Sequence, residues 1–312
     1  MISEHLFFFR IVSCLFLLKE LLSPYFIQRL MTIELFYFSG TGNSYHIAKE
    51  LSQRLSNVTL TPIVKLLDRK QVKTNADVVG FVFPTYFTSV PAPVRSFLKT
   101  LNLSSAHYIF SITTRGGTFC VANMNINRMV KKKGKMLDAH FILDMIMNTP
   151  TGLKPGKGFE NWDDIIKKEN IEAVETTIQS ELDEISQIIK KRRPYPEKQG
   201  FHPIRLFLER LMYLFTRNIK AEIKYITDET CTGCGLCEQV CLSKKVRLID
   251  RKPIWDPSIQ CYYCYACFNI CPTQSILVKN KYLKKDGRYI HPQVTVDDIA
   301  QQKGYYEQSE LE

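Results

Sequence analysis

Two copies of one cysteine pattern constrain this chain most. Eight of its ten cysteines lie between Cys231 and Cys271, and only Cys14 and Cys120 lie outside that stretch. Each copy has the spacing C-x2-C-x2-C-x3-C, and Pro272 follows the second. The cysteines are Cys231, Cys234, Cys237 and Cys241 in the first copy, and Cys261, Cys264, Cys267 and Cys271 in the second. A tight cluster favours metal ligation over a disulfide framework, which predicts a reducing, cytoplasmic compartment.

The spacing also distinguishes between metals. Zinc sites usually combine two C-x2-C pairs from separate stretches around one tetrahedral ion. Here three cysteines fall within seven residues, twice. That arrangement gives three irons of a cubane one thiolate each, while the fourth cysteine reaches the other cluster. The sequence therefore predicts two [4Fe-4S] clusters.

The region 224–280 resembles the bacterial two-cluster ferredoxins. The resemblance implies one cluster on Cys231, Cys234, Cys237 and Cys271 (the cluster 1 site) and another on Cys261, Cys264, Cys267 and Cys241 (the cluster 2 site). Leu242 follows Cys241 where the family pattern has proline. This departure changes no ligand, and the region is expected to be a small α+β ferredoxin domain.

Upstream, short apolar runs alternate with helical patterns. We expect strands at Ile33–Phe38, 57–64, 77–83, 106–113 and 136–147, and helices at 43–56, 92–101 and 121–133. Strands that are apolar on both faces and alternate with helices indicate a parallel sheet covered on both sides. Pro62 suggests that the second strand is an edge. The sequence predicts an α/β domain over 31–150, with a doubly wound, five-stranded parallel sheet.

The loop after the first strand reads SGTGNS and contains Ser39, Gly40, Thr41, Gly42, Asn43 and Ser44. It lacks the lysine of a Walker A loop and does not fit G-x-G-x-x-G. Its backbone N–H groups, hydroxyls and helix N-terminus suit one phosphate. Two more loops follow later strands: Pro84, Thr85, Tyr86 and Phe87, then Thr114, Arg115, Gly116 and Gly117. In a doubly wound sheet such loops converge at the carboxyl edge, where ligands bind.

Together these three loops resemble those of the flavodoxins. The resemblance implies that Ser39 to Ser44 bind the phosphate of FMN, that the 84–87 loop places Tyr86 on or beside the flavin, and that 114–117 offers N–H groups to its edge. Two interpretations of Arg115 stay open: its guanidinium lies near the flavin ring, or it points toward solvent. Cys120 is expected to be packed. The whole chain resembles the flavodoxin–ferredoxin fusions of anaerobes.

The remaining segments have weaker patterns. Residues 151–223 are expected to form a helical linker or cover, with an amphipathic helix from Ile171 to Ile189 and a second helix over 203–218. Residues 281–312 form a polar C-terminal tail, with a short helix capped by Thr295 and Asp298.

Residues 1–30 form an apolar extension, but their longest uncharged run, Ile11 to Leu18, is too short to span a bilayer. Three readings of the extension stay open: a loosely docked amphipathic helix, a start codon placed before the true start at Met31, or a weak membrane-surface anchor.

These features predict an electron-transfer protein that relays electrons between FMN and two [4Fe-4S] clusters. The alternative is an iron–sulfur flavoenzyme that reduces a quinone or nitro compound, and a third reading is a docking scaffold without flavin. The net charge of +11 suits an acidic redox partner protein. No nucleic-acid-binding motif is present, so nucleic acid is not expected as a partner.

Overall fold

The structure is a computed structural model. It describes residues 31–117, 120–147, 161–195, 211, 223–279 and 282–304. The predictions for residues 1–30 lie outside the described residues. So does the predicted second linker helix over 203–218, apart from Leu211.

A five-stranded parallel sheet forms the centre of the N-terminal domain. Its strands are β1 (Ile33–Tyr37), β2 (Val58–Pro62), β4 (Val78–Pro84), β6 (Tyr108–Arg115) and β7 (Ala139–Asp144). They lie in the order β2-β1-β4-β6-β7, and every neighbouring pair is parallel. Counted along the chain, this is the 2-1-3-4-5 order of flavodoxin-like folds. The predicted doubly wound sheet is confirmed, and β2 lies at its edge.

The middle strands are apolar because both faces of the sheet are covered. In β4 every residue from Val78 to Phe83 is buried. Gly80 has no room for a side chain, because an added Cβ would lie 2.4 Å from the Phe110 ring and 2.5 Å from Leu35. A run of buried residues without alternation is typical of central parallel strands.

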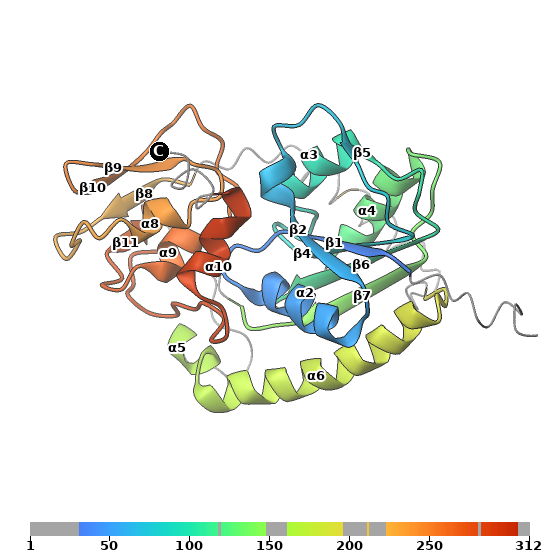
Figure 1. Cartoon of the computed structure of the whole chain (residues 1–312). Coiled ribbons are helices and arrows are strands. Elements are labelled where there is room, and N and C mark those ends of the chain that lie inside the picture. The colour runs from blue at the N-terminus through green and yellow to red at the C-terminus, as the bar shows by residue number, and fades with distance from the viewer. Residues whose placement is uncertain are drawn as a thin grey trace, which may run out of the picture.

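Helices cover the two faces of the sheet (Figure 1). α2 (Asn43–Arg54) and α6 (Lys168–Lys190) lie on one face, and α3 (Ala92–Thr100) and α4 (Ala122–Lys131) lie on the other. The predicted amphipathic linker helix corresponds to α6, which packs its buried residues Ile178, Leu182 and Ile185 with those of α2 and the sheet. Short connections contain η1 (Ile63–Leu66) and the paired strands β3 (Val72–Lys73) and β5 (Leu101–Asn102).

The cysteine region is a small domain of two two-stranded antiparallel sheets and two short helices. β8 (Tyr225–Thr227) pairs antiparallel with β11 (Ile276–Val278), and β9 (Val246–Ile249) pairs antiparallel with β10 (Lys252–Trp255). The helices are α8 (Leu236–Gln239) and α9 (Ala266–Ile270). Trp162 of α5 (Trp162–Ile165) belongs to this domain's hydrophobic core. Because α6 follows α5 directly, this segment runs along both domains (Figure 1).

The segment 282–304 packs between the two domains. It contains α10 (Val296–Ala300) and η2 (Gln301–Lys303), and α10 begins with the predicted capping box of Thr295 and Asp298. The sequence predicts a polar tail here, yet Ile299, Ala300 and Gln302 are fully buried. Ile299 belongs to one hydrophobic cluster with residues of the sheet and of the cysteine region. In the part of the chain that the structure describes, no helix has the length and apolar character needed to cross a membrane.

Candidate redox site at the domain boundary

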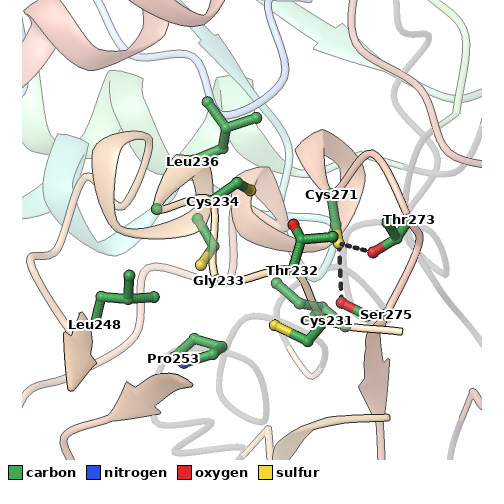
Figure 2. Close-up of a pocket in the computed structure, with 13 residues that line it drawn as sticks. Cys231, Thr232, Gly233, Cys234, Leu236, Leu248, Pro253, Cys271, Thr273 and Ser275 are labelled. Atoms are coloured by element: carbon green, nitrogen blue, oxygen red, sulfur yellow. Dashed lines mark hydrogen bonds between the residues drawn. The ribbon is translucent and has the colours of Figure 1, made fainter. Parts of the chain in front are cut away.

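The cluster 1 site is a pocket that contains four thiols. Cys231, Cys234, Cys237 and Cys271 line it, together with Gly233 and Gly235, and Figure 2 shows several of them around the pocket. Gly233 has a positive φ of 67°, and an added Cβ would lie 2.5 Å from the carbonyl oxygen of Arg251. Glycine is therefore required where the chain turns between two ligands.

Hydroxyl groups support one of these sulfurs. The Sγ of Cys271 lies 3.2 Å from Ser275 Oγ and 3.7 Å from Thr273 Oγ1 (Figure 2). Burial by itself raises the pKa of the Cys271 thiol, but these two hydrogen bonds and those from the backbone N–H groups of Ser275 and Ile276 together outweigh it, so the pKa lies below its ordinary value. Hydrogen bonds to ligand sulfurs are one way in which a protein tunes a cluster.

The cluster 2 site is more enclosed. Burial raises the pKa of Cys261, Cys264 and Cys267, and neighbouring thiols raise it further. Cys241 is among the neighbours of all three, although it belongs to the first cysteine motif. In the same way, Cys271 lies near enough to affect the pKa of Cys237. The structure therefore places Cys271 beside the first three cysteines and Cys241 beside the three of the second motif.

The donor set fits iron–sulfur clusters. Each site brings four thiols together, which suits zinc or an iron–sulfur centre. Burial raises the pKa of Cys237 to about 12, so without a metal this thiol holds its proton. Metal binding would displace such protons, because only the thiolate is a ligand.

The SGTGNS loop lies against the cluster 2 site. An added Cβ at Gly40 would lie 2.6 Å from both the Cβ and the carbonyl oxygen of Cys264, and 2.8 Å from the hydroxyl of Tyr86. Only glycine allows the two backbones to come this close. All six residues from Ser39 to Ser44 are buried.

Segment 282–304 binds the same loop. Gln302 accepts a hydrogen bond from the Ser39 backbone N–H (2.9 Å) and donates to the Ser39 carbonyl (2.8 Å). The backbone N–H of His291 donates to the Thr41 carbonyl at 2.9 Å. Gly42 donates its N–H to Ser39 Oγ, and its φ of 100° is left-handed. The amide of Ser39 is thus already used, whereas the first turn of α2 has N–H groups with no helical partner.

The loop after β4 forms a tight, strained turn. Tyr86 and Ser89 exchange two backbone hydrogen bonds, and the residues between them, Phe87 and Thr88, have left-handed φ angles of 51° and 62°. Such values are uncommon outside glycine and are often retained at functional sites. Phe87 is 42% exposed, and its ring lies edge-on to Tyr263 of the cysteine region, 5.3 Å between centroids. The preceding Pro84 pairs with Thr114 in the sheet.

The third loop is anchored to the sheet. Ser44 and Thr114 share a hydrogen bond of 2.8 Å between their hydroxyls, and Thr85 donates its N–H to the Thr114 carbonyl. Arg115 forms an ion pair with Asp144 of β7, with Nε 2.6 Å from Oδ1. This contact holds the guanidinium at the end of the neighbouring strand. Gly116 packs on Met147, and Gly117 is exposed.

Buried polar atoms at these loops fit a polar ligand. Asn43 Oδ1, Thr88 Oγ1 and Thr113 Oγ1 are buried and have no hydrogen-bond partner among the described residues. Buried polar atoms without a partner are rare in native proteins. One belongs to the SGTGNS loop, one to the turn after β4, and one to the end of β6. A flavin, whose ribityl chain and ring carry many polar groups, fits this set of residues. Cys120 is buried, as predicted.

Sequence reasoning missed a trio behind the SGTGNS loop, formed by two buried histidines and the partly buried Glu175. His46 Nε2 lies 3.0 Å from Glu175 Oε1, His291 Nε2 lies 3.7 Å from Glu175 Oε2, and the two imidazole rings stack at 4.0 Å. Burial, and then the neighbouring His46, lower the pKa of His291 to about 4. For Glu175, burial raises the pKa, but the hydrogen bonds from Gln179 and His46, together with the electrostatic effect of His46 and His291, outweigh it. No sequence signal links residues so far apart in the chain.

The trio could in principle hold a metal ion, since its three ligand atoms lie within 4.8 Å of one another. However, the backbone N–H of Gln293 donates to His291 Nδ1. This bond leaves the ring proton on Nε2, facing Glu175, whereas a metal-bound imidazole normally donates from its other nitrogen. Parallel stacked rings also cannot both direct an in-plane lone pair at one ion. The geometry therefore favours a proton-bridged trio.

Arg288 was also missed, because it follows the predicted 224–280 boundary. Its guanidinium lies 3.2 Å from the centroid of the Phe268 ring and donates to the carbonyls of Phe268, Gln274 and Ile276. Burial lowers its pKa to about 10, so it stays cationic at neutral pH. It affects the electrostatics of Cys271 and Cys267, one thiol from each site.

Comparisons with known proteins agree with the cysteine motif. Residues 223–284 match the family model of the 4Fe-4S dicluster domain. Among solved structures, a flavodoxin from the domain Archaea is 14% identical over 50% of this chain and 99% of its own, with a TM-score of 0.31. Megasphaera elsdenii flavodoxin is 15% identical over 36% and 85%, with a TM-score of 0.27.

An NAD(P)H:quinone oxidoreductase from Methanothermobacter marburgensis is 9% identical over 55% of this chain and 98% of its own, with a TM-score of 0.34. The flavodoxin-like fold of the sheet domain follows from its strand order. No curated protein matches the chain.

Proposed function

We propose that this chain, a flavodoxin-like domain joined to a 4Fe-4S dicluster domain, transfers electrons between FMN and two [4Fe-4S] clusters. When bound, the flavin exchanges one or two electrons and each cluster exchanges one, so the pair would connect two-electron and one-electron carriers. The protein's part is to bind these groups, orient them and exclude water.

The observation that carries the proposal is the contact between the SGTGNS loop and the cluster 2 site. Gly40 and Cys264 touch through their backbones, with no intervening layer of side chains. Residues predicted to bind the flavin and residues predicted to bind a cluster therefore share one boundary. Phe38 packs its ring edge against both Tyr86 and Tyr262 there, at centroid distances of 6.0 and 6.2 Å. These contacts place three aromatic rings at the boundary.

The two cluster sites differ in exposure, which suggests an order. Cys241 and Cys267 of the cluster 2 site are buried beside the flavodoxin-like domain, whereas Cys234 of the cluster 1 site is exposed. In this arrangement the cluster held by the cluster 2 site would exchange electrons with the flavin. The cluster held by the cluster 1 site would exchange electrons with an external carrier protein.

The decisive test is a joint count of iron, sulfide and flavin on protein purified without oxygen. We expect about eight irons per chain, as two cubane clusters require, and one FMN. A redox titration followed by absorption and electron paramagnetic resonance would then resolve three centres. Full iron with no flavin would overturn the relay and favour a docking scaffold.

The enzyme alternative is separated by kinetics. If the chain were a flavoenzyme for a quinone or nitro compound, the reduced protein would react faster with these molecules than with a ferredoxin, and the rate would saturate with their concentration. We expect the reverse order, with faster electron transfer to the protein carrier.

A further inference from the structure

The β9–β10 hairpin has two different faces. Leu248 and Pro253 point inward and line the cluster 1 pocket, beside Cys231 and Cys234 (Figure 2). Side chains on a strand alternate between faces, so the residues between these two point the other way. The outer face consists of Arg247, Ile249, Lys252 and Ile254, all exposed.

This outer face combines cations with exposed apolar groups. In the register of the hairpin Ile254 lies opposite Arg247, and Lys252 lies opposite Ile249. Ile249 is 56% exposed and Ile254 is 49% exposed. The outer face of a small antiparallel sheet is normally polar, so two exposed isoleucines on this face call for an explanation. Figure 1 shows the hairpin at the end of the dicluster domain that lies away from the central sheet.

We propose that the outer face of the β9–β10 hairpin is the docking surface for an acidic one-electron carrier protein. The inference rests on the proposed function and adds to it the place and chemistry of the partner. A partner seated on this face would be separated from the cluster 1 thiols only by the hairpin itself, because Leu248 and Pro253 line that pocket.

The positive charge of the hairpin indicates an acidic partner. Arg247, Lys252 and the exposed Arg251 of the turn outnumber the single exposed acid of the hairpin, Asp250. Complementary charges steer association and orient the partner, while apolar contact at the centre supplies much of the affinity. Arg251 also donates to the Thr232 carbonyl between two cluster 1 cysteines, which fixes the turn to the pocket.

The test measures the binding of a purified acidic ferredoxin to the cluster-loaded full chain by calorimetry, at several salt concentrations. Arg247→Glu/Lys252→Glu should weaken binding about tenfold at low salt and flatten the salt dependence. Ile249→Ser/Ile254→Ser should weaken binding at low and high salt alike, because apolar contact is not screened. Lys70→Glu/Lys73→Glu, with the same charge change on exposed residues of the other domain, should stay within about twofold of the wild type.

Two results would overturn the proposal. The first is equal weakening by the hairpin and control charge reversals, which would mean that only net charge matters. The second is tighter binding of the wild type to anionic lipid vesicles than to the ferredoxin. Iron content and cluster absorption of each variant show that it is folded. Binding is measured whether or not flavin is present. A protein without flavin would therefore contradict the proposed function but not the docking surface, and the two failures can be told apart.

Discussion

At the scale of single residues, the departure from the ferredoxin pattern has a structural cause. Leu242 follows Cys241 where bacterial ferredoxins have proline. Its side chain is only 2% exposed and belongs to a hydrophobic cluster that also contains Phe36 and Phe38 of the flavodoxin-like domain. A proline offers less apolar surface at this position. Leu242 therefore takes part in the packing between the two domains.

We expect Leu242→Ala to destabilise the protein by about 2–5 kcal/mol, the usual cost of truncating a buried leucine. The ligands are untouched, so iron content should stay unchanged. Thermal unfolding measures the effect, and Leu283→Ala is a matched control because Leu283 is 60% exposed in the same part of the chain. Equal, small shifts in both variants would show that Leu242 does not join the domains.

At the scale of elements, the segment with α10 and η2 fixes the SGTGNS loop. Gln302 is fully buried and satisfies both the N–H and the carbonyl of Ser39. The side-chain amide of Gln302 thus bonds to Ser39 as the backbone of a neighbouring strand would. It holds the loop in the shape in which Gly40 meets Cys264.

Replacing Gln302 with leucine keeps the volume but removes both hydrogen bonds. Two buried backbone groups of Ser39 would then lack a partner, at about 1–3 kcal/mol for each. We expect a lower melting temperature and faster hydrogen exchange at residues 39–44. The neighbouring Gln301 is exposed, so Gln301→Leu should leave the exchange of this loop unchanged. Slow exchange in both variants would mean that other contacts hold the loop.

The sequence predicted the elements better than their assembly. The strands and helices of the sheet domain follow from apolar runs and periodicity, which are local properties. Thr295 and Asp298 also predicted their cap, because capping is local. In contrast, the burial of Gln302 could not be predicted, since a polar residue in a polar segment shows no sign of a partner 263 residues away. The same reason hid the contact between His46 and His291.

At the scale of the whole molecule, the trio of His46, Glu175 and His291 links three distant parts of the chain. His46 comes from α2, Glu175 from α6, and His291 from the segment after the dicluster domain. Glu175 contacts both histidines, so the trio holds the covering helices to the domain boundary. The stability that the trio contributes depends on pH, because His291 is neutral in the folded protein over a pH range in which an unfolded histidine is charged.

Lowering the pH should therefore destabilise the folded protein through His291. Its pKa is about 4 when folded and about 6.5 when unfolded, so the unfolded state binds more protons between these values. Stability is then fully present above pH 6.5 and falls as the pH is lowered toward 4, by about 2 kcal/mol between pH 7 and pH 5. The lowered pKa of Glu175 acts in the same direction below its ordinary value. Melting temperatures measured from pH 7 to pH 5 should fall more for the wild type than for His291→Gln.

The comparison between variants is essential, because the thiolate ligands and the buried His140, whose pKa burial lowers to about 3, also make the protein acid-sensitive. These groups are common to both proteins, so the difference between the two curves isolates the trio. The exposed His107 supplies a control, and His107→Gln should follow the wild-type curve. If the curves of the wild type and His291→Gln ran parallel, His291 would not be taking up a proton on unfolding. The trio would then hold the domains together by packing alone.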